Sequence, residues 1–276
     1  MSVRLHNILT GALESSYATS IFNAPEKHPL FKKEDLLPYG HKERKYAEDG
    51  SFEPGLMVPV PVWFIEGEDQ NILIDTGLGD CEEIMALQGS YGIDYVATKT
   101  KEQEIVTALA AKGLKPEDID VVVLTHLHFD HIGNNELFKN ARFIVQKDEV
   151  PLLLNPPHFA TFYYREWKHK ITAISDRLEM IEGNYRLTKN VELIKAGGHA
   201  AGQMVVMADT PKSGKVCLAS DFFYNYSNIR NNWPMGPLWN VQQWIDSCKW
   251  IKSNADLIVP NHDYELFNYY PDGIIE

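Results

Sequence analysis

The stretch His126-Leu127-His128-Phe129-Asp130-His131 places three imidazoles and a carboxylate within six consecutive residues. It follows closely on Val121-Val122-Val123-Leu124, a continuous apolar run typical of a strand that is buried on both faces. A lone histidine is usually structural, but ligand-type side chains gathered this densely after a buried strand indicate a metal site. If the chain turns sharply there, alternate side chains can face one ion while Asp130 and His131 face a second ion nearby.

The whole chain has the composition of a single folded domain. Of its 276 residues, 44% are hydrophobic and 23% are charged, and no internal repeat or low-complexity tract marks a second unit. We therefore expect one domain over residues 1–276. We expect two insertions in it: a polar, proline-broken loop at about residues 23–55 and an aromatic-rich, helical segment at about residues 156–185.

The charge and the cysteine content of the chain limit its possible binding partners and its cellular location. The formal net charge of −12, with no basic cluster, argues against a nucleic-acid partner. No apolar run approaches the roughly 18 residues that span a bilayer, and the start of the chain lacks the apolar core of a signal peptide. Cys81, Cys217 and Cys248 show no CxxC spacing, so we expect reduced thiols. These features predict a cytoplasmic protein with neither a membrane nor a nucleic-acid partner.

Strand and helix patterns alternate irregularly along the chain. Residues 57–65 and 71–75 predict a hairpin in which Pro59 and Pro61 stand where no ladder donor is needed. Helical spacing indicates helices at 100–113, 148–154 and 240–253. Further strands are expected at 121–124, 142–145, 192–195, 204–208, 216–219 and 257–259. This order is typical of a layered α/β sandwich.

With these motifs in place, the chain resembles the metallo-β-lactamase superfamily, whose members carry HxHxDH after a buried strand and further ligands late in the chain. The resemblance spans about residues 56–265 and implies an α/β fold, the four-layer αββα sandwich of that superfamily. It also implies metal ligands at His126, His128, Asp130, His131, His199, Asp221 and His262, with Asp221 shared between two metals. Asp75 matches an aspartate that supports the site from behind, although an aspartate there can equally cap a turn.

Within the superfamily, the N-acyl homoserine lactonase branch is the most similar, because both metal sites are complete and Tyr224 lies three residues after Asp221. That branch places a tyrosine hydroxyl at the substrate carbonyl. The alternative is that Phe222, Phe223, Tyr224 and Tyr226 form one packing cluster. Two positions depart from the branch: Gly197 replaces its usual proline, and Gln203 replaces a frequent histidine.

The resemblance implies a dinuclear metal-dependent hydrolase that opens a lactone ring, of an N-acyl homoserine lactone or a related compound, by attack of a metal-bridging hydroxide. Tyr224 would hydrogen-bond the oxyanion, and Asp130, besides binding metal, would pass a proton to the leaving alkoxide. Two divalent ions per chain are expected, with Zn²⁺ as the default and Mn²⁺, Fe²⁺ or Co²⁺ suited to the same ligands. The expected partner is a small-molecule substrate. The chain is expected to be a monomer or a homodimer.

Other functions fit the same motif. The nearest alternative is another hydrolase that uses the same metals on a thioester, a phosphodiester or a β-lactam, although Tyr224 and the lack of a basic cluster argue against a phosphodiester. A di-iron oxidoreductase is a second alternative, but proteins of that kind with this fold usually have a glutamate where His128 stands. A third alternative is a metal-binding regulatory protein that catalyses no reaction. A set of aromatic and neighbouring side chains either walls an apolar pocket or packs in the core. This set comprises His158, Phe159, Phe162, Tyr163, Tyr164, Trp167, Trp233, Met235 and Trp239.

Overall fold

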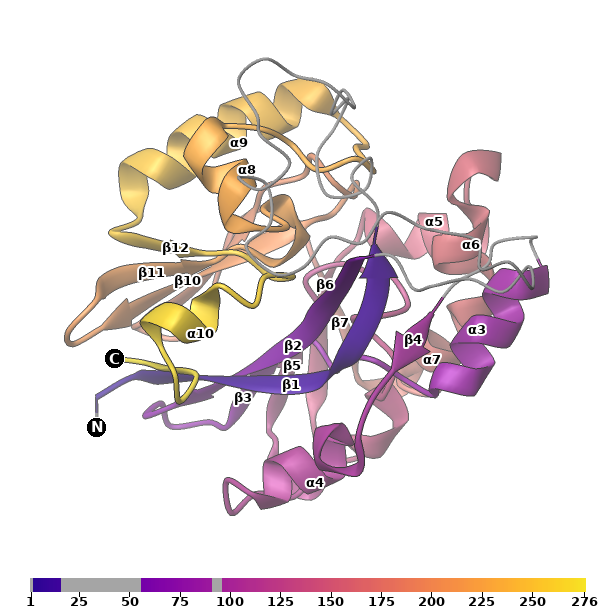
Figure 1. Ribbon diagram of the computed structural model, residues 1–276, viewed down its shortest axis with the longest axis horizontal. Helices are drawn as coiled ribbons and strands as arrows, with labels where there is room; N and C mark the ends of the chain where they lie inside the picture. The colour runs from indigo at the N-terminus through magenta and orange to yellow at the C-terminus, as the bar shows by residue number, and fades with distance from the viewer. Residues whose placement is uncertain (1, 16–55, 91–95) are drawn as a thin grey trace, which may run out of the picture.

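Two β-sheets pack face to face, and helices cover the outer side of each sheet in a computed structural model of the chain (Figure 1). The structure describes residues 2–15, 56–90 and 96–276. This arrangement confirms the expected four-layer αββα sandwich. The loop predicted at residues 23–55 lies outside the described residues.

The larger sheet has the strand order β13-β1-β2-β3-β5-β6-β7, with β4 paired to β1. The strands β3, β5, β6 and β7 are parallel neighbours, so their carboxyl ends meet at one edge of the sheet. The strand bounds are β1 (Arg4–Ser15), β2 (Leu56–Glu66), β3 (Ile72–Ile74), β4 (Ala97–Thr98), β5 (Val121–Val123), β6 (Arg142–Gln146), β7 (Leu178–Ile181) and β13 (Ile274–Ile275).

The smaller sheet has the order β12-β11-β10-β9-β8. Its strand β10 is antiparallel to both β9 and β11, and β11 is parallel to β12. The carboxyl ends of β9, β11 and β12 therefore also share one edge. The bounds are β8 (Tyr185–Arg186), β9 (Val191–Lys195), β10 (Met204–Thr210), β11 (Gly214–Leu218) and β12 (Leu257–Val259).

Helices and short 3-10 turns connect the strands. The α-helices are α3 (Cys81–Ser90), α4 (Ile105–Ala110), α5 (Glu149–Leu154), α6 (Thr161–Tyr164), α7 (Lys168–Thr172), α8 (Tyr226–Asn231), α9 (Val241–Asn254) and α10 (Leu266–Tyr269). The 3-10 turns are Lys101–Gln103, Pro116–Asp118, Asn135–Leu137, His158–Ala160, Arg165–Trp167, Ser175–Arg177 and Ser220–Phe222. Among the described residues, no helix has the length and apolar character needed to cross a membrane.

Alternating side chains explain why each sheet is covered on both faces. In β5, Val121 and Val123 pack between the two sheets, whereas Val122 packs against the helices of the larger sheet. In β10, Val206 faces the other sheet and Val205 packs with residues of α9. Because successive residues of a strand point to opposite faces, a continuous apolar run is what a strand in the middle of four layers requires.

The predicted hairpin is confirmed as β2 and β3, which pair antiparallel with Trp63 opposite Ile74. The aromatic segment is less helical than expected: its last 3-10 turn ends at Arg177, and β7 follows as an edge strand beside β6. The sequence analysis did not predict β1 or β13. In β1 the buried polar residues His6 and Asn7 obscure the alternation on which strand prediction depends. All cysteines are free thiols, as expected.

Candidate metal centre

Each residue predicted as a metal ligand follows the carboxyl end of a strand. The HxHxDH motif follows β5, while His199, Asp221 and His262 follow β9, β11 and β12. These strand ends meet where the two sheets adjoin, and all of the side chains concerned are buried. The fold thus brings together residues that are as much as 136 positions apart in the chain, from His126 to His262 (262 − 126).

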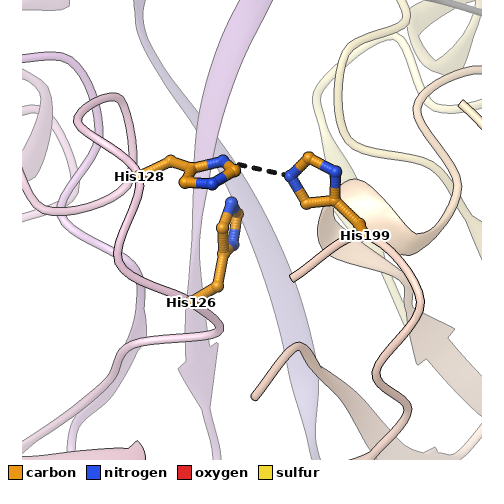
Figure 2. A group of neighbouring side chains, drawn as sticks. All are labelled: His126, His128 and His199. Atoms are coloured by element: carbon orange, nitrogen blue, oxygen red, sulfur yellow. Dashed lines mark hydrogen bonds between the residues drawn. The ribbon is translucent and has the colours of Figure 1, made fainter. Parts of the chain in front are cut away.

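The imidazoles of His126, His128 and His199 converge on one point (Figure 2). The Nε2 atom of His199 lies 3.1 Å from the Nδ1 atom of His128. The ring of His126 lies below this pair, with its centroid 4.4 Å from that of His128 and 5.0 Å from that of His199. Nitrogen atoms this close together can coordinate a single ion.

A second group consists of Asp130, His131 and His262. The Oδ2 atom of Asp130 lies 3.6 Å from Nε2 of His131 and 3.6 Å from Nε2 of His262. Asp221 stands between the two groups. Its Oδ1 atom lies 3.1 Å from Nε2 of His262, and its Oδ2 atom lies 3.7 Å from Nε2 of His199. One carboxylate therefore offers an oxygen atom to each group.

The first group has the protonation state that a metal requires, because a metal binds the unprotonated nitrogen of imidazole. Burial lowers the pKa of His126, His128 and His199, and neighbouring imidazoles lower the pKa of His126 and His128 further. The Nε2 atom of His126 is buried and has no hydrogen-bond partner among the residues that the structure describes. An orphaned lone pair inside a protein is costly unless an unseen group binds it, so the site fits a metal ion.

Around Asp221 the charges are balanced differently. Burial alone would lower the pKa of His131 and His262, but the carboxylates of Asp130 and Asp221 outweigh it and raise the pKa of both imidazoles. Burial also acts to raise the pKa of Asp221, yet the imidazoles of His262 and His131 hold it well below its usual range. Asp221 is therefore an ionised carboxylate in a place where cations are stabilised.

Hydrogen bonds on the far side of the rings orient several of these candidate ligands. The carbonyl oxygens of Pro237 and Pro59 lie 2.7 Å from the Nδ1 atoms of His199 and His262 respectively. Because a carbonyl oxygen only accepts, each Nδ1 carries the proton and each Nε2 atom is left facing the centre. His131 is held in the same way by a carboxylate oxygen of Asp75, 2.8 Å from its Nδ1 atom.

Asp75 lies behind His131 rather than merely capping a turn. Its carboxylate also accepts hydrogen bonds from the backbone N–H of Thr125 (2.7 Å) and from its hydroxyl (2.8 Å). The residue adopts a positive φ of 62°, which is uncommon outside glycine. Such strain persists where the surrounding structure holds it, and here Thr125 and His131 hold the carboxylate by hydrogen bonds.

The aromatic run after Asp221 divides between the core and the site. Phe222 and Phe223 pack with Trp244 in the core under α9. The ring of Tyr224 lies 4.4 Å from the ring of His262. Its hydroxyl hydrogen-bonds the Ser15 side chain, and burial together with the charge of Asp221 raises its pKa, so the phenol stays protonated.

Side chains of the aromatic segment also contact the metal centre. The sequence pattern left open whether they line a pocket or pack in the core. The ring of Tyr163 in α6 stacks on His128 at 4.5 Å with an interplanar angle of 21°. The ring of Tyr164 meets His128 edge-on at 4.9 Å. By contrast, Trp239 is 40% exposed. Nothing in the local sequence distinguishes Tyr163 from its aromatic neighbours, because only the packing of α6 selects it.

Comparisons with known proteins find relatives over most of the chain. The family model of the metallo-beta-lactamase superfamily matches residues 56–262. An N-acyl homoserine lactonase of Bacillus thuringiensis is 30% identical over 246 residues, which cover 85% of this chain and 94% of that protein. One from Bacillus cereus is 31% identical over 191 residues, covering 67% and 73%. A solved N-acyl homoserine lactone hydrolase, with N-hexanoyl-L-homoserine bound at its catalytic metal center, has a TM-score of 0.75, 24% identity and coverage of 98% and 97%.

Proposed function

This chain belongs to the metallo-β-lactamase superfamily, and on that premise we propose that it is a dinuclear metal-dependent lactonase that opens N-acyl homoserine lactones or closely related lactones. The observation that carries the proposal is the carboxylate of Asp221, with one oxygen beside His262 and the other beside His199. His126, His128 and His199 would hold one ion, and Asp130, His131 and His262 the other. Zn²⁺ is the default for such nitrogen and oxygen donors.

Divalent ions bound there would lower the pKa of water toward neutrality and polarise a substrate carbonyl. The protein itself supplies orientation and a proton donor. Tyr224 is buried beside His262 and stays protonated, so its hydroxyl can donate a hydrogen bond to the carbonyl oxygen as negative charge develops. Asp130, a member of the second group, would pass a proton from the attacking water to the leaving alkoxide.

A lactone suits the surroundings of the centre. The ring of Tyr163 stacks on His128 and is partly exposed, so an apolar group attached to the lactone would meet aromatic carbon there. The curated relatives named above are lactonases that match most of this chain, which supports the same substrate class.

Two measurements test the proposal together: elemental analysis of the purified protein, and acid release from a panel of γ- and δ-lactones that includes N-acyl homoserine lactones. We expect two metal ions per chain and acid release that stops when a chelator removes them. Two ions without turnover of any lactone would overturn the lactonase proposal and leave a thioester, phosphodiester or β-lactam as substrate. Oxygen consumption by a di-iron form would instead favour the oxidoreductase alternative.

A further inference from the structure

Glu149 is a buried carboxylate that no step described above uses. It begins α5, directly after β6, and its side chain is fully buried. Among the described residues no cation lies within ion-pair distance of it, and burial raises its pKa. Burying a carboxylate in this way is costly unless hydrogen bonds compensate for the lost water. Its role must therefore be sought in the groups that donate to it.

The donors to Glu149 come from the two loops that supply the first group of ligands. Its Oε2 atom accepts a hydrogen bond from the backbone N–H of Leu127 (3.0 Å), the residue between His126 and His128. Its Oε1 atom accepts one from the backbone N–H of Gly202 (2.7 Å), three residues after His199. One rigid carboxylate thus ties the HxH segment to the loop of His199.

Two further contacts show that the side chains around the Glu149 carboxylate are tightly packed. The Tyr164 hydroxyl donates to the same Oε2 atom at 3.3 Å, and the ring of Tyr164 packs against His128. Gly202 leaves room for the approach: a Cβ atom there would lie 2.7 Å from Cβ of Gln146 and 2.8 Å from Cγ of Glu149. A side chain at position 202 would push the loop away from the carboxylate.

We propose that Glu149 is a positioning residue that sets the spacing between His126 and His128 on one loop and His199 on the other, and thereby the affinity for the first metal ion. The inference rests on the metal centre of the proposed function, but it does not depend on which substrate is hydrolysed. Groups that orient metal ligands typically contribute about tenfold to a hundredfold to metal affinity. In the described part of the chain, Glu149 bonds the HxH segment and the loop of His199 but neither Asp221 nor His262, so the second ion should be affected much less.

The direct test is Glu149→Gln, which keeps the shape of the side chain but replaces one acceptor oxygen with an NH₂ group. Metal affinity is measured by competition with a chromophoric chelator, and ligand geometry by the visible spectrum of the Co²⁺-loaded protein. We expect one of the two ions to bind about tenfold to a hundredfold more weakly, with a changed Co²⁺ spectrum. The other ion should bind as in the wild type.

Gln146→Ala is the matched control. Gln146 is also fully buried, ends β6, and bonds the backbone of Gly183 instead of a ligand loop. It should lower the thermal stability of the metal-free protein without selective loss of one ion. The proposal would be overturned if Glu149→Gln lowered the affinity for both ions equally and lost as much thermal stability as Gln146→Ala. That result would show a general structural role for Glu149.

If Glu149→Gln does not fold, Gly202→Ala is measured instead. This variant leaves the Glu149 carboxylate in place and displaces the loop that carries His199. The same selective weakening of one ion is expected, and wild-type affinity for both ions in this variant would overturn the inference. A wild-type protein that binds no metal would overturn the proposed function as well. A wild-type protein that binds two ions but opens no lactone would leave the role of Glu149 standing.

Discussion

The Oδ1 atom of Asp221 lies 3.2 Å from the Nε2 atom of His131, although the two residues follow strands of different sheets and are 90 positions apart (221 − 131). The same oxygen accepts a hydrogen bond from the side-chain amide of Asn261 at 3.0 Å. Both atoms are buried, and within residues 2–15, 56–90 and 96–276 the carboxylate is surrounded by imidazoles and this amide. This relationship supports the proposal that Asp221 serves both groups of candidate ligands.

We therefore expect Asp221→Ala to lose one or both metal ions and nearly all activity, because it removes an oxygen donor from each group. Elemental analysis and the lactone assay on the same preparation provide the measurement. Asp209→Ala, on an exposed position of β10, is the matched control and should keep both ions. Full metal content and activity in Asp221→Ala would refute its assignment as a shared ligand.

Tyr224→Phe should keep its metal ions and lose roughly tenfold to a thousandfold in kcat, which is the scale for removing one donor to an oxyanion. The phenyl ring preserves the packing against His262. Tyr226→Phe removes a hydroxyl two residues away, on a ring that packs against Tyr269, and should leave kcat unchanged. An unchanged kcat in Tyr224→Phe would remove this hydroxyl from the reaction.

Tyr163→Ala should raise KM more than it lowers kcat, since it removes the ring stacked on His128 and a wall of the proposed pocket. The loss of such an apolar contact is worth about 1–3 kcal/mol, or roughly tenfold to a hundredfold in kcat/KM. Tyr163→Phe retains the ring and should stay near the wild-type value. Steady-state kinetics on lactones of increasing acyl length will show whether the effect grows with chain length, and a KM unchanged throughout would exclude Tyr163 from the pocket.

Gly133→Ala should destabilise the fold, because a Cβ atom there would lie 2.2 Å from the backbone nitrogen of Gly79 and 2.6 Å from the carbonyl oxygen of Gly77. These backbones join the turn after Asp75 to the end of the ligand motif through the hydrogen bond from Gly133 N–H to Gly77. Overpacking of this kind costs roughly 1–3 kcal/mol.

Urea denaturation measures the change in the free energy of unfolding. Gly89→Ala in α3, where nothing lies within 4 Å of the added methyl group, is the control and should stabilise the protein by about 0.5–1 kcal/mol. Equal stability of the two variants would mean that the strands carrying Asp75 and the ligand motif can separate without cost.

Much of the fold and the site was predictable because its signals are local. The apolar run of Val121 to Val123 before HxHxDH predicts both a central strand and the ligands at its end. The aspartate and histidines later in the chain were found only through resemblance to a family, since a single His199 or His262 carries no signal of its own. Strand β1 was missed because polar residues interrupt its alternating pattern. The last part of the aromatic segment was wrongly predicted as helix, because β7 is an edge strand in which two of the residues are only half-buried and the strand pattern is weak.

By itself, then, the sequence determined which residues have metal-binding chemistry and which segments must be buried on two faces. Only the tertiary structure decided which ligand nitrogens face the centre, because the groups that orient them come from distant strands. The carbonyl oxygen of Pro59, for example, is 203 residues from His262 in the chain. It also decided that Tyr163 covers His128 and that Glu149 joins two ligand loops. Such contacts depend on how helices and loops pack across strand ends, which no local pattern encodes.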